Sequence, residues 1–147
     1  MKISTKGRYA LRMLLDIYQH QGKGAVALKD VAERQNISKK YLEQIALVLS
    51  QSGMLHGARG LQGGYRVVGK ATDYTVCEIL ERMEGSLHPV ACLDHAPNDC
   101  ERCNGCETLF IWEGLDKVIR DYLTSMTLQD VLDRMTAARA AKEESVN

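Results

Sequence analysis

The chain has 147 residues, 45% of them hydrophobic, which is enough for one domain or two small, closely packed ones and is not typical of a disordered chain. No apolar run approaches the roughly 18 residues that cross a bilayer, and the first residues show no signal-peptide pattern, so we expect a cytoplasmic protein with no membrane partner. The net charge of zero conceals a basic first half, with twelve basic and four acidic side chains up to Lys70, and an acidic second half. A first half with this charge is suited to bind a polyanion.

Three helices are predicted in the N-terminal part of the chain. Apolar residues that recur every four positions indicate a helix over 5–20, and a second, short helix is predicted over 28–35. Asn36 forms a turn, and Ser38 is suited to cap a third helix, which ends before Gly53. The third helix begins with exposed polar side chains, a pattern typical of a helix-turn-helix that enters the major groove of DNA. The alternative is an ordinary helical hairpin in a bundle.

A glycine-rich hairpin is predicted directly after the third helix. Short strands over 54–56 and 65–68 flank a loop, 57–64, that contains four glycines and one cation, Arg59. A hairpin in this place is typical of the wing of a winged helix, where Arg59 is suited to a narrow minor groove or a phosphate. A nucleotide-binding loop is the alternative, but the Lys-Ser/Thr ending and the following helix are missing. The residues that we expect to contact DNA are Lys2, Ser38, Lys39, Lys40, Tyr41, Glu43, Gln44, Arg59, Gly60, Gly63 and Gly64.

The second half is predicted to be helical on both sides of an irregular loop. Thr75 and Glu78 form a capping box for a helix that Gly85 ends. Residues 86–106 show no periodicity and hold four of the five cysteines. The longest helix is predicted over 107–125, and a helix of that length on a small domain commonly pairs with its symmetry mate. Its apolar stripe, which we expect at a homodimer interface, consists of Ile111, Leu115, Val118, Ile119 and Tyr122.

A second capping box, Thr127 with Asp130, begins a final helix, and the polar end from Lys142 is expected to fray. The predicted fold is mainly α with a small β wing: a winged helix-turn-helix plus a long dimerisation helix. We expect a winged helix-turn-helix DNA-binding domain over 1–70, a connecting helix over 71–85, a cysteine-rich sensor loop over 86–106, the dimerisation helix and final helix over 107–142, and a frayed tail over 143–147.

Three segments resemble the Rrf-type family of winged helix-turn-helix transcription regulators, which includes the IscR, NsrR and CymR types. They are MKISTKGRYALRMLLDI, ISKKYLEQIALVLSQSGML and GARGLQGGYRV. The resemblance covers nearly the whole chain, and its most specific part is YLEQ followed by RGxxGGY. It implies a homodimer that binds partly palindromic operators in double-stranded DNA. Many members hold an iron–sulfur cluster, whereas the CymR type has none and regulates cysteine metabolism with a partner protein.

The loop cysteines Cys92, Cys100, Cys103 and Cys106 are separated by seven, two and two residues. Thiolates at short spacings on an irregular loop can converge on a soft metal. The resemblance implies three cluster ligands, of which the last two are separated by five residues just ahead of the long helix. Cys92, Cys100 and Cys106 match this pattern with a longer first gap, so a two-iron or four-iron cluster is expected.

The identity of the fourth ligand stays open. The histidine that the IscR type carries three residues after its last cysteine is replaced by Leu109, and the acid that the NsrR type carries near its N-terminus is replaced by Arg8. Cys103 would complete an all-cysteine site. His95 is a second candidate, although a lone histidine in a loop is more often simply solvated.

Two other interpretations of the loop remain: structural zinc, which accepts four cysteines in a closed tetrahedral site, and thiol-based sensing without metal. Cys77 is expected to be a small core residue. No Ser-His-Asp order, His-Glu-x-x-His or paired-carboxylate motif occurs, so we do not expect an enzyme. The sequence predicts a dimeric, sequence-specific DNA-binding regulator that senses cluster or redox status. The alternative is a cluster-free, CymR-like regulator of cysteine or sulfur metabolism, controlled by thiols or a protein partner.

Overall fold

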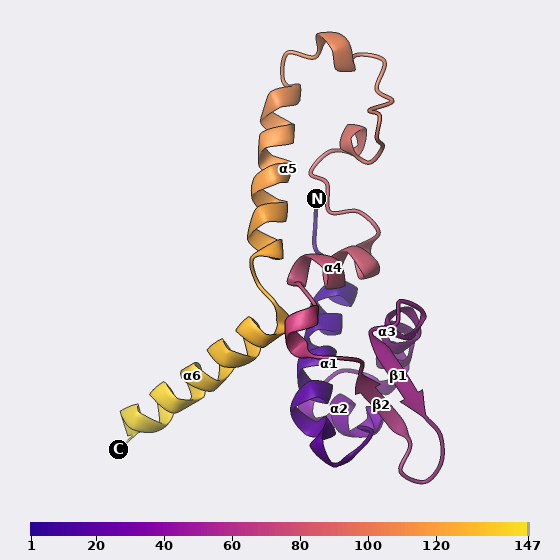
Figure 1. The fold of residues 1–147 in the computed structure, drawn as a ribbon, viewed down its shortest axis with the longest axis vertical. Coiled ribbons are helices and arrows are strands. Elements are labelled where there is room, and N and C mark those ends of the chain that lie inside the picture. The colour runs from indigo at the N-terminus through magenta and orange to yellow at the C-terminus, as the bar shows by residue number, and fades with distance from the viewer. Residues whose placement is uncertain (147) are drawn as a thin grey trace.

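The computed structural model describes residues 1–146, which form six α-helices and one two-stranded antiparallel sheet. The prediction of a mainly α fold with a small β wing is thus confirmed. In Figure 1, α1 to α3 and the hairpin form the lower part, α5 rises above them, and α6 leaves on the side away from the wing. The helices and strands are α1 (Thr5–His20), α2 (Leu28–Gln35), α3 (Lys39–Gln51), β1 (Leu55–Ala58), β2 (Gly64–Val67), α4 (Val76–Glu84), α5 (Leu109–Thr124) and α6 (Leu128–Val146).

The N-terminal core is built around α1. Because residues three and four apart share a helix face, Met13, Leu14 and Ile17 are all turned inward and fully buried. At the turn between α2 and α3, Asn36 adopts the left-handed conformation with φ 52°, and the Ser38 hydroxyl accepts the Tyr41 N–H at 3.2 Å, as its predicted capping role requires. The buried partners of α1 from α2 and α3 are Val31, Leu42, Ile45 and Leu49.

Asp16 of α1 is a buried carboxylate that joins α1 to α2. It is 2% exposed, and it accepts a hydrogen bond from Arg34 Nη2 at 2.6 Å and another from Gln35 Nε2 at 2.9 Å. Burial raises the pKa of Asp16, but the hydrogen bonds from Arg34 and Gln35 outweigh burial and hold the pKa below its ordinary value. The two helices are therefore held by a charge pair as well as by apolar packing.

The wing is the hairpin β1–β2. Leu55 pairs with Val67 and both are buried, whereas the next pair, His56 with Arg66, is turned to solvent. The observed strands, Leu55–Ala58 and Gly64–Val67, are shifted by one or two residues at their ends from the predicted 54–56 and 65–68. Val26 exchanges two backbone hydrogen bonds with Tyr65, at 2.9 and 2.8 Å, and a side chain at position 64 would collide with the Val26 carbonyl.

The end of α4 caps the beginning of α1. Glu84 accepts hydrogen bonds from the Ser4 backbone N–H at 2.9 Å and from the Ser4 hydroxyl at 2.7 Å. Gly7 makes this approach possible, because a Cβ there would overlap the Glu84 carboxylate and press on Leu80. The connecting helix is thus fixed directly to the first helix of the winged domain.

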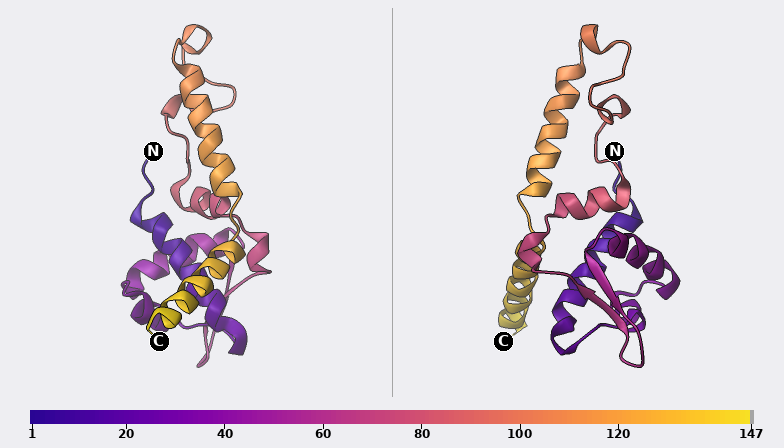
Figure 2. Two further views of the ribbon diagram at one scale, coloured as in Figure 1. Left: turned by 90° about the vertical axis from the view of Figure 1, so that its left-hand side faces the viewer. Right: turned by 45° about the vertical axis from the view of Figure 1, so that its right-hand side comes forward.

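Two backbone hydrogen bonds join the start of α4 to the corner between α5 and α6. Val76 N–H donates to the Met126 carbonyl at 2.9 Å, and Leu128 N–H donates to the Tyr74 carbonyl at 2.9 Å. Both predicted capping boxes are confirmed: Thr75 with Glu78 begins α4, and Thr127 with Asp130 begins α6. Figure 2 shows how α5 and α6 diverge from this corner.

One expectation about the C-terminal helices was wrong. The longest described helix is α6, with 19 residues, and not α5, with 16. Residues 143–146 of the expected tail belong to α6, and the last tail residue, 147, lies outside the described residues; fraying of this end stays a prediction. The length of α6 follows from composition, because alanine, lysine, arginine and glutamate make up residues 137–144 and all have high helix propensity. No helix within residues 1–146 is long and apolar enough to cross a membrane.

Candidate DNA-binding surface and cysteine loop

The outward face of α3 carries the side chains that were predicted to contact DNA. Leu42, Ile45, Ala46 and Leu49 of α3 are buried, which fixes the opposite face toward solvent. The exposed side chains in the first two turns of that face are Lys39, Lys40, Glu43 and Gln44. The helix therefore presents two cations, one carboxylate and one amide at its N-terminal end.

Three of the predicted contact residues already have partners within the chain. Lys39 Nζ lies 3.5 Å from Glu43 Oε1, and both side chains are more than half exposed, at 59% and 53%. An exposed pair of this kind contributes only about 0.3–0.5 kcal/mol, so it can open when a stronger partner is present. Tyr41 is half-buried, and its ring packs edge-on against the Tyr9 ring at a centroid distance of 5.8 Å. Tyr41 consequently has a structural role whether or not it touches DNA.

In the wing, the glycines shape the loop and Arg59 supplies the charge. Gly60 has a φ of 106°, and a Cβ at Gly63 would lie 2.7 Å from the Ala58 carbonyl oxygen. Together with Gly64, they allow a tight hairpin that a side chain would open. Arg59 and Lys2, the remaining predicted contacts, are both exposed.

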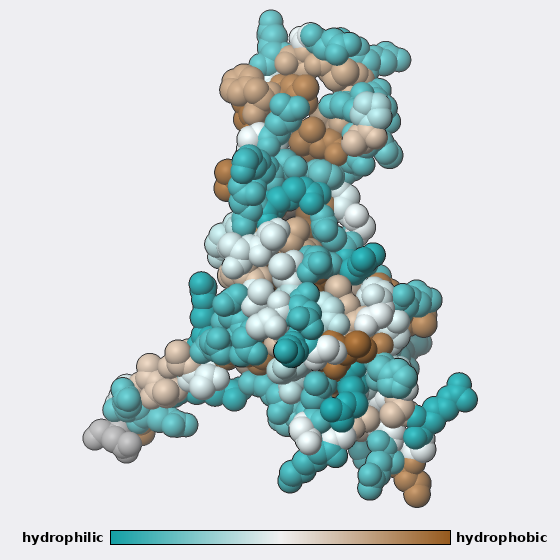
Figure 3. All heavy atoms as spheres, viewed as in Figure 1, coloured by the Kyte–Doolittle hydropathy of each residue, from teal (hydrophilic) through white to brown (hydrophobic). Residues whose placement is uncertain are grey.

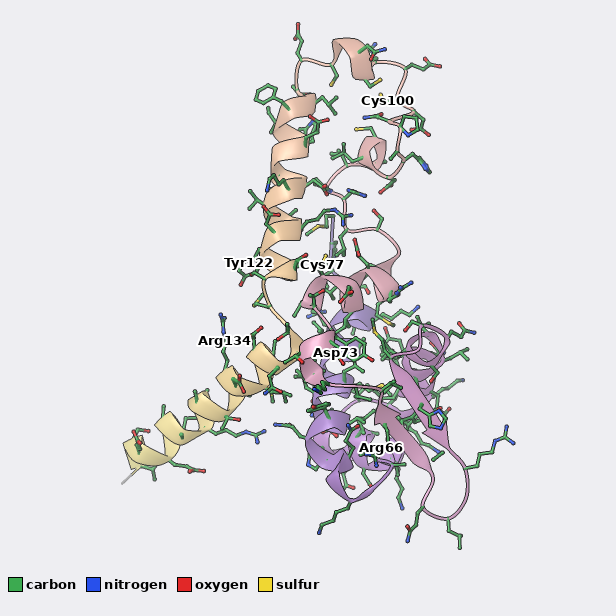
Figure 4. All side chains as sticks on the ribbon, in the orientation of Figure 1. Arg66, Asp73, Cys77, Cys100, Tyr122 and Arg134 are labelled. Carbon is green, nitrogen blue, oxygen red and sulfur yellow. The ribbon has the colours of Figure 1, made fainter. Side chains whose placement is uncertain are left out.

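A groove lies between the start of α2, the start of α3 and the base of the wing. Lys29 and Lys39 are among its lining residues, together with Glu43 and Gly64. Sequence reasoning missed Lys29, and it also missed Arg66, which is exposed on the outer face of β2 (Figure 4). In the sequence, the apolar–charged–apolar order of Tyr65, Arg66 and Val67 is the signal that would have placed Arg66 on the solvent face of the strand.

The four loop cysteines are free thiols with half-buried side chains. Cys103 N–H donates to the Cys100 carbonyl at 3.0 Å, so these two residues close one tight turn. Cys106 Sγ lies 3.6 Å from Thr108 Oγ1 at the start of α5. Hydrogen bonds from the Thr108 side chain and backbone hold the pKa of the Cys106 thiol below its usual range.

Two further residues from the sequence analysis are Cys77, expected in the core, and His95, the second candidate for the fourth ligand. Cys77 is buried in α4, packed beside Val76, Leu80 and Leu87, as predicted for a core residue. Figure 4 places it on α4, whereas Cys100 lies on the loop above. His95 is 68% exposed, with Nε2 3.9 Å from Asp99 Oδ2, so it is a solvated side chain in this conformation.

A polar network connects the cysteine loop to α4 and α5. His88 Nδ1 donates to Asp116 Oδ1 at 2.7 Å, which leaves His88 Nε2 to accept from Arg120 Nη2 at 3.1 Å. Arg120 also binds Glu81 of α4 through Nη1 at 2.6 Å. The loop, the connecting helix and α5 therefore meet at one guanidinium group.

The predicted interface stripe of α5 is largely unpacked in the single chain. Ile111, Leu115, Val118 and Tyr122 are 45%, 43%, 65% and 61% exposed, and Ile119 is half-buried. Figure 3 shows brown, apolar surface along the upper part of the molecule, where α5 lies. Exposed apolar patches of this kind usually mark contact sites.

The family model for Rrf2, described as an iron-dependent transcriptional regulator, matches residues 3–134. The chain belongs to the Rrf2 family. Protein rrf2 of Nitratidesulfovibrio vulgaris is 39% identical over 132 residues, which cover 90% of this chain and 87% of that protein. The structure of CymR, the global cysteine regulator of B. subtilis, matches with a TM-score of 0.75 and 31% identity over 91% of this chain and 98% of CymR. T. potens IscR matches with a TM-score of 0.75 and 37% identity over 94% of this chain and 90% of IscR.

Membership in the Rrf2 family confirms two predictions: the chain is a DNA-binding transcription regulator, and it is not an enzyme. It is of the IscR and CymR type, and both structures match it with the same TM-score. The two interpretations of the loop, cluster and cluster-free, therefore differ in the chemistry of the cysteines and not in the fold.

The donor set of the loop suits an iron–sulfur cluster, since soft thiolates are the ligands that such clusters use. In the conformation described for residues 1–146, no three Cys, His, Asp or Glu side chains are gathered as metal ligands. Regular backbone in the loop is confined to two short 3-10 turns, η3 (Ala91–Leu93) and η4 (Cys103–Gly105). The residues therefore fit the group chemically, and the loop would have to rearrange to hold it.

Proposed function

We propose that this Rrf2-family chain acts in the cytoplasm as a homodimeric, sequence-specific regulator whose DNA binding depends on an iron–sulfur cluster in the cysteine loop. The observation that carries this proposal is the placement of four free thiols on one loop directly before α5, the helix with the unpacked apolar stripe. The proposed sensor loop would thus lead directly into the helix that makes the dimer contact.

DNA would be bound by the outward face of α3 and by the wing. In this arrangement Gln44 and Glu43 face base edges, and Lys39, Lys40 and Arg59 face phosphates or the minor groove. The exposure of these side chains supports the assignment. Because the glycines of the wing carry no side chains, the hairpin could approach the duplex closely. Its backbone N–H groups could then donate hydrogen bonds to phosphate oxygens.

The dimer would form through α5. A two-fold axis would pair the stripes of two copies and cover Leu115, Val118 and Tyr122, which are exposed in the single chain. The relative position of the two α3 helices would then depend on α5. Recognition helices of such dimers must match half-sites about one helical turn, ~34 Å, apart.

Cys92, Cys100 and Cys106 would hold the cluster, with Cys103 or a group outside the loop as the fourth ligand. When bound, the cluster supplies a redox- and oxygen-sensitive centre whose presence reports iron and sulfur supply. Ordering of residues 86–106 would fix the start of α5, and the His88–Arg120–Glu81 network would carry that order to α4. A coupling of about 1–3 kcal/mol would change operator occupancy five- to 150-fold.

A cluster-free regulator of cysteine or sulfur metabolism is the second candidate. It is favoured by the lowered pKa of Cys106, because a thiolate is the reactive form in thiol sensing. The likeness to CymR, a global cysteine regulator, supports the same idea. In this version the thiols themselves, or a protein partner, would set the DNA affinity.

Anaerobic purification separates the two candidates. The protein is isolated without oxygen, and its iron, acid-labile sulfide, zinc and visible absorption are measured. We expect a brown protein with iron and sulfide in equal amounts. A colourless protein without metal would support the cluster-free regulator, and a colourless protein with one zinc per chain would make the loop a structural clasp.

A further inference from the structure

Leu47 occupies the middle of the outward face of α3. Its side chain is 59% exposed, although the neighbouring buried residues Ile45, Ala46 and Leu49 belong to the core. Residues three, four and seven apart share a helix face, so Leu47 follows Lys40, Glu43 and Gln44 along one row. A leucine therefore continues the row of polar side chains that faces DNA in the proposed function.

A single exposed leucine is ordinary, so the location of Leu47 decides its meaning. Within residues 1–146, the large exposed apolar side chains outside the chain ends and α5 are Leu47, Leu61 and Val68. Leu47 lies on α3 with exposed Lys39 and Lys40, and Leu61 lies on the wing loop with exposed Arg59. In the free chain, neither side chain contributes to the core.

The major groove offers one apolar group that matches such a side chain. Among the base edges there, only thymine carries a methyl group, whereas all other features are hydrogen-bond donors or acceptors. Leucine has no hydrogen-bonding group, and Gln44, one turn earlier on the same row, suits the adenine of an adjacent A·T pair. We propose that Leu47 contacts a thymine methyl group in the major groove and makes operator choice depend on that methyl.

This inference rests on the proposed function, because it needs α3 to be the recognition helix. Loss of one buried methyl group corresponds to about a fourfold loss of affinity. Losses at well-separated positions are roughly additive in free energy, so removal of the methyl from both half-sites would weaken a dimer about fifteenfold.

The experiment replaces thymine by deoxyuridine, which removes only the methyl group. A duplex is first selected from a random library with the wild-type protein, and each thymine is then replaced in turn at constant salt. We expect the wild type to lose about fourfold in affinity at one thymine of each half-site. Leu47→Ala should bind the thymine and uracil duplexes equally, and Leu47→Met should keep the preference. Leu61→Ala, the same truncation in the wing, is the matched control and should keep the wild-type preference at that thymine.

Two outcomes overturn the inference while leaving the proposed function intact. In the first, the wild type binds its selected duplex but is insensitive to every uracil replacement. In the second, Leu47→Ala keeps the full methyl preference of the wild type. If the wild-type protein selects no duplex at all, the proposed function fails as well, and Leu47 has no role in recognition.

Discussion

At the residue scale, the charge of Arg59 is the simplest part of the proposed interface to test. A cation that neutralises a phosphate releases a counterion, so its removal lowers the salt dependence of binding. Arg59→Ala should weaken duplex binding and reduce the log–log slope against salt by about one unit for each phosphate that Arg59 neutralises.

The measurement is a binding titration of one duplex at several salt concentrations. Leu61→Ala is the matched control, since it shortens a neighbouring exposed side chain of the same loop without changing charge. It should leave the slope unchanged. Equal affinity of Arg59→Ala and wild type at every salt concentration would show that the wing does not contact DNA through this residue.

The buried Asp16 predicts a specific loss of stability in acid. The pKa of Asp16 is lower in the folded chain than in the unfolded chain, so the folded state binds the proton less readily. The stabilisation is therefore fully present above the unfolded value, about 3.9, and is lost as the pH falls through the lower folded value. Urea unfolding should show the free energy of unfolding decreasing in that window.

Asp16→Ala should flatten this acid decrease and lower the free energy of unfolding at neutral pH by about 1–3 kcal/mol, because Arg34 loses its partner. Asp99→Ala is the control, since Asp99 is 66% exposed and, within residues 1–146, is paired only with solvated His95, at 3.9 Å. A wild-type-like acid decrease in Asp16→Ala would mean that other carboxylates produce it.

The local polar caps could be predicted from sequence, and the long-range ones could not. Ser38, the Thr75–Glu78 pair and the Thr127–Asp130 pair each involve residues three apart, so a short motif contains all of the information. The pairing of Ser4 with Glu84 joins residues 80 positions apart. Nothing in either local sequence indicates it, because it depends on how α4 packs across α1.

At the element scale, periodicity predicted where helices lie better than how long they are. The ends of α1 and α2 follow from glycine and from the Asn36 turn. The end of α6 has no such signal, since its alanine-rich, charged sequence lacks an apolar stripe yet remains helical. The cysteine loop was predicted as irregular, but its link to α4 through His88 and Arg120 was not, because four charged or polar residues from three segments combine there.

The stripe of α5 should control assembly. Leu115→Asp or Ile119→Asp would place an unpaired charge in the proposed interface, at a cost of several kcal/mol. Sedimentation should show a monomer, and circular dichroism should show that the helices persist. Glu113→Ala, on the other side of α5, is the control and should remain dimeric. Dimers in both aspartate variants would indicate that the dimer forms through another surface than this stripe.

The Arg120 network should hold the upper part of the molecule to α4. Arg120→Ala removes the donor that binds both Glu81 and His88, and it should cost about 1 kcal/mol because these groups are partly exposed. Hydrogen exchange should become faster in residues 86–90 and in the C-terminal half of α5, while α3 stays protected.

Lys117→Ala is the matched control for this network. Its ion pair with Asp121 is also within α5, but both side chains are largely exposed, at 75% and 65%. Surface pairs of this kind contribute little, so exchange should not change. Faster exchange over the whole chain in Arg120→Ala would assign the residue to global stability instead of a link between elements.

At the scale of the whole molecule, the fold and the placement of the two candidate functional regions follow from the sequence pattern, whereas the ligand state of the cysteine loop does not. A basic winged domain with an exposed α3 face and a cysteine loop before α5 were both predicted, and both are present. Ligand identity depends on how four thiols converge in three dimensions. Spacing alone limits that geometry only weakly, since residues 86–106 contain little regular backbone.

The cysteine variants test the sensor as a unit. Cys92→Ser, Cys100→Ser and Cys106→Ser, prepared without oxygen, should each lose iron and visible absorption, because each removes a thiolate from the proposed cluster. Cys103→Ser should lose as much if the site is all-cysteine, and much less if the fourth ligand comes from outside the loop. The measurement is iron and sulfide content per chain beside the absorption spectrum.

Cys77→Ser is the matched control, because it makes the same substitution in the core of α4 and not in the loop. It should keep the wild-type iron content while the free energy of unfolding falls by about 1–3 kcal/mol, since a hydroxyl replaces a buried thiol. A loss of iron in this variant alone would move the site to α4. Normal iron in all three loop variants would leave Cys92, Cys100 and Cys106 without a ligand role, and the loop would then act through its thiols, among them Cys106 with its lowered pKa.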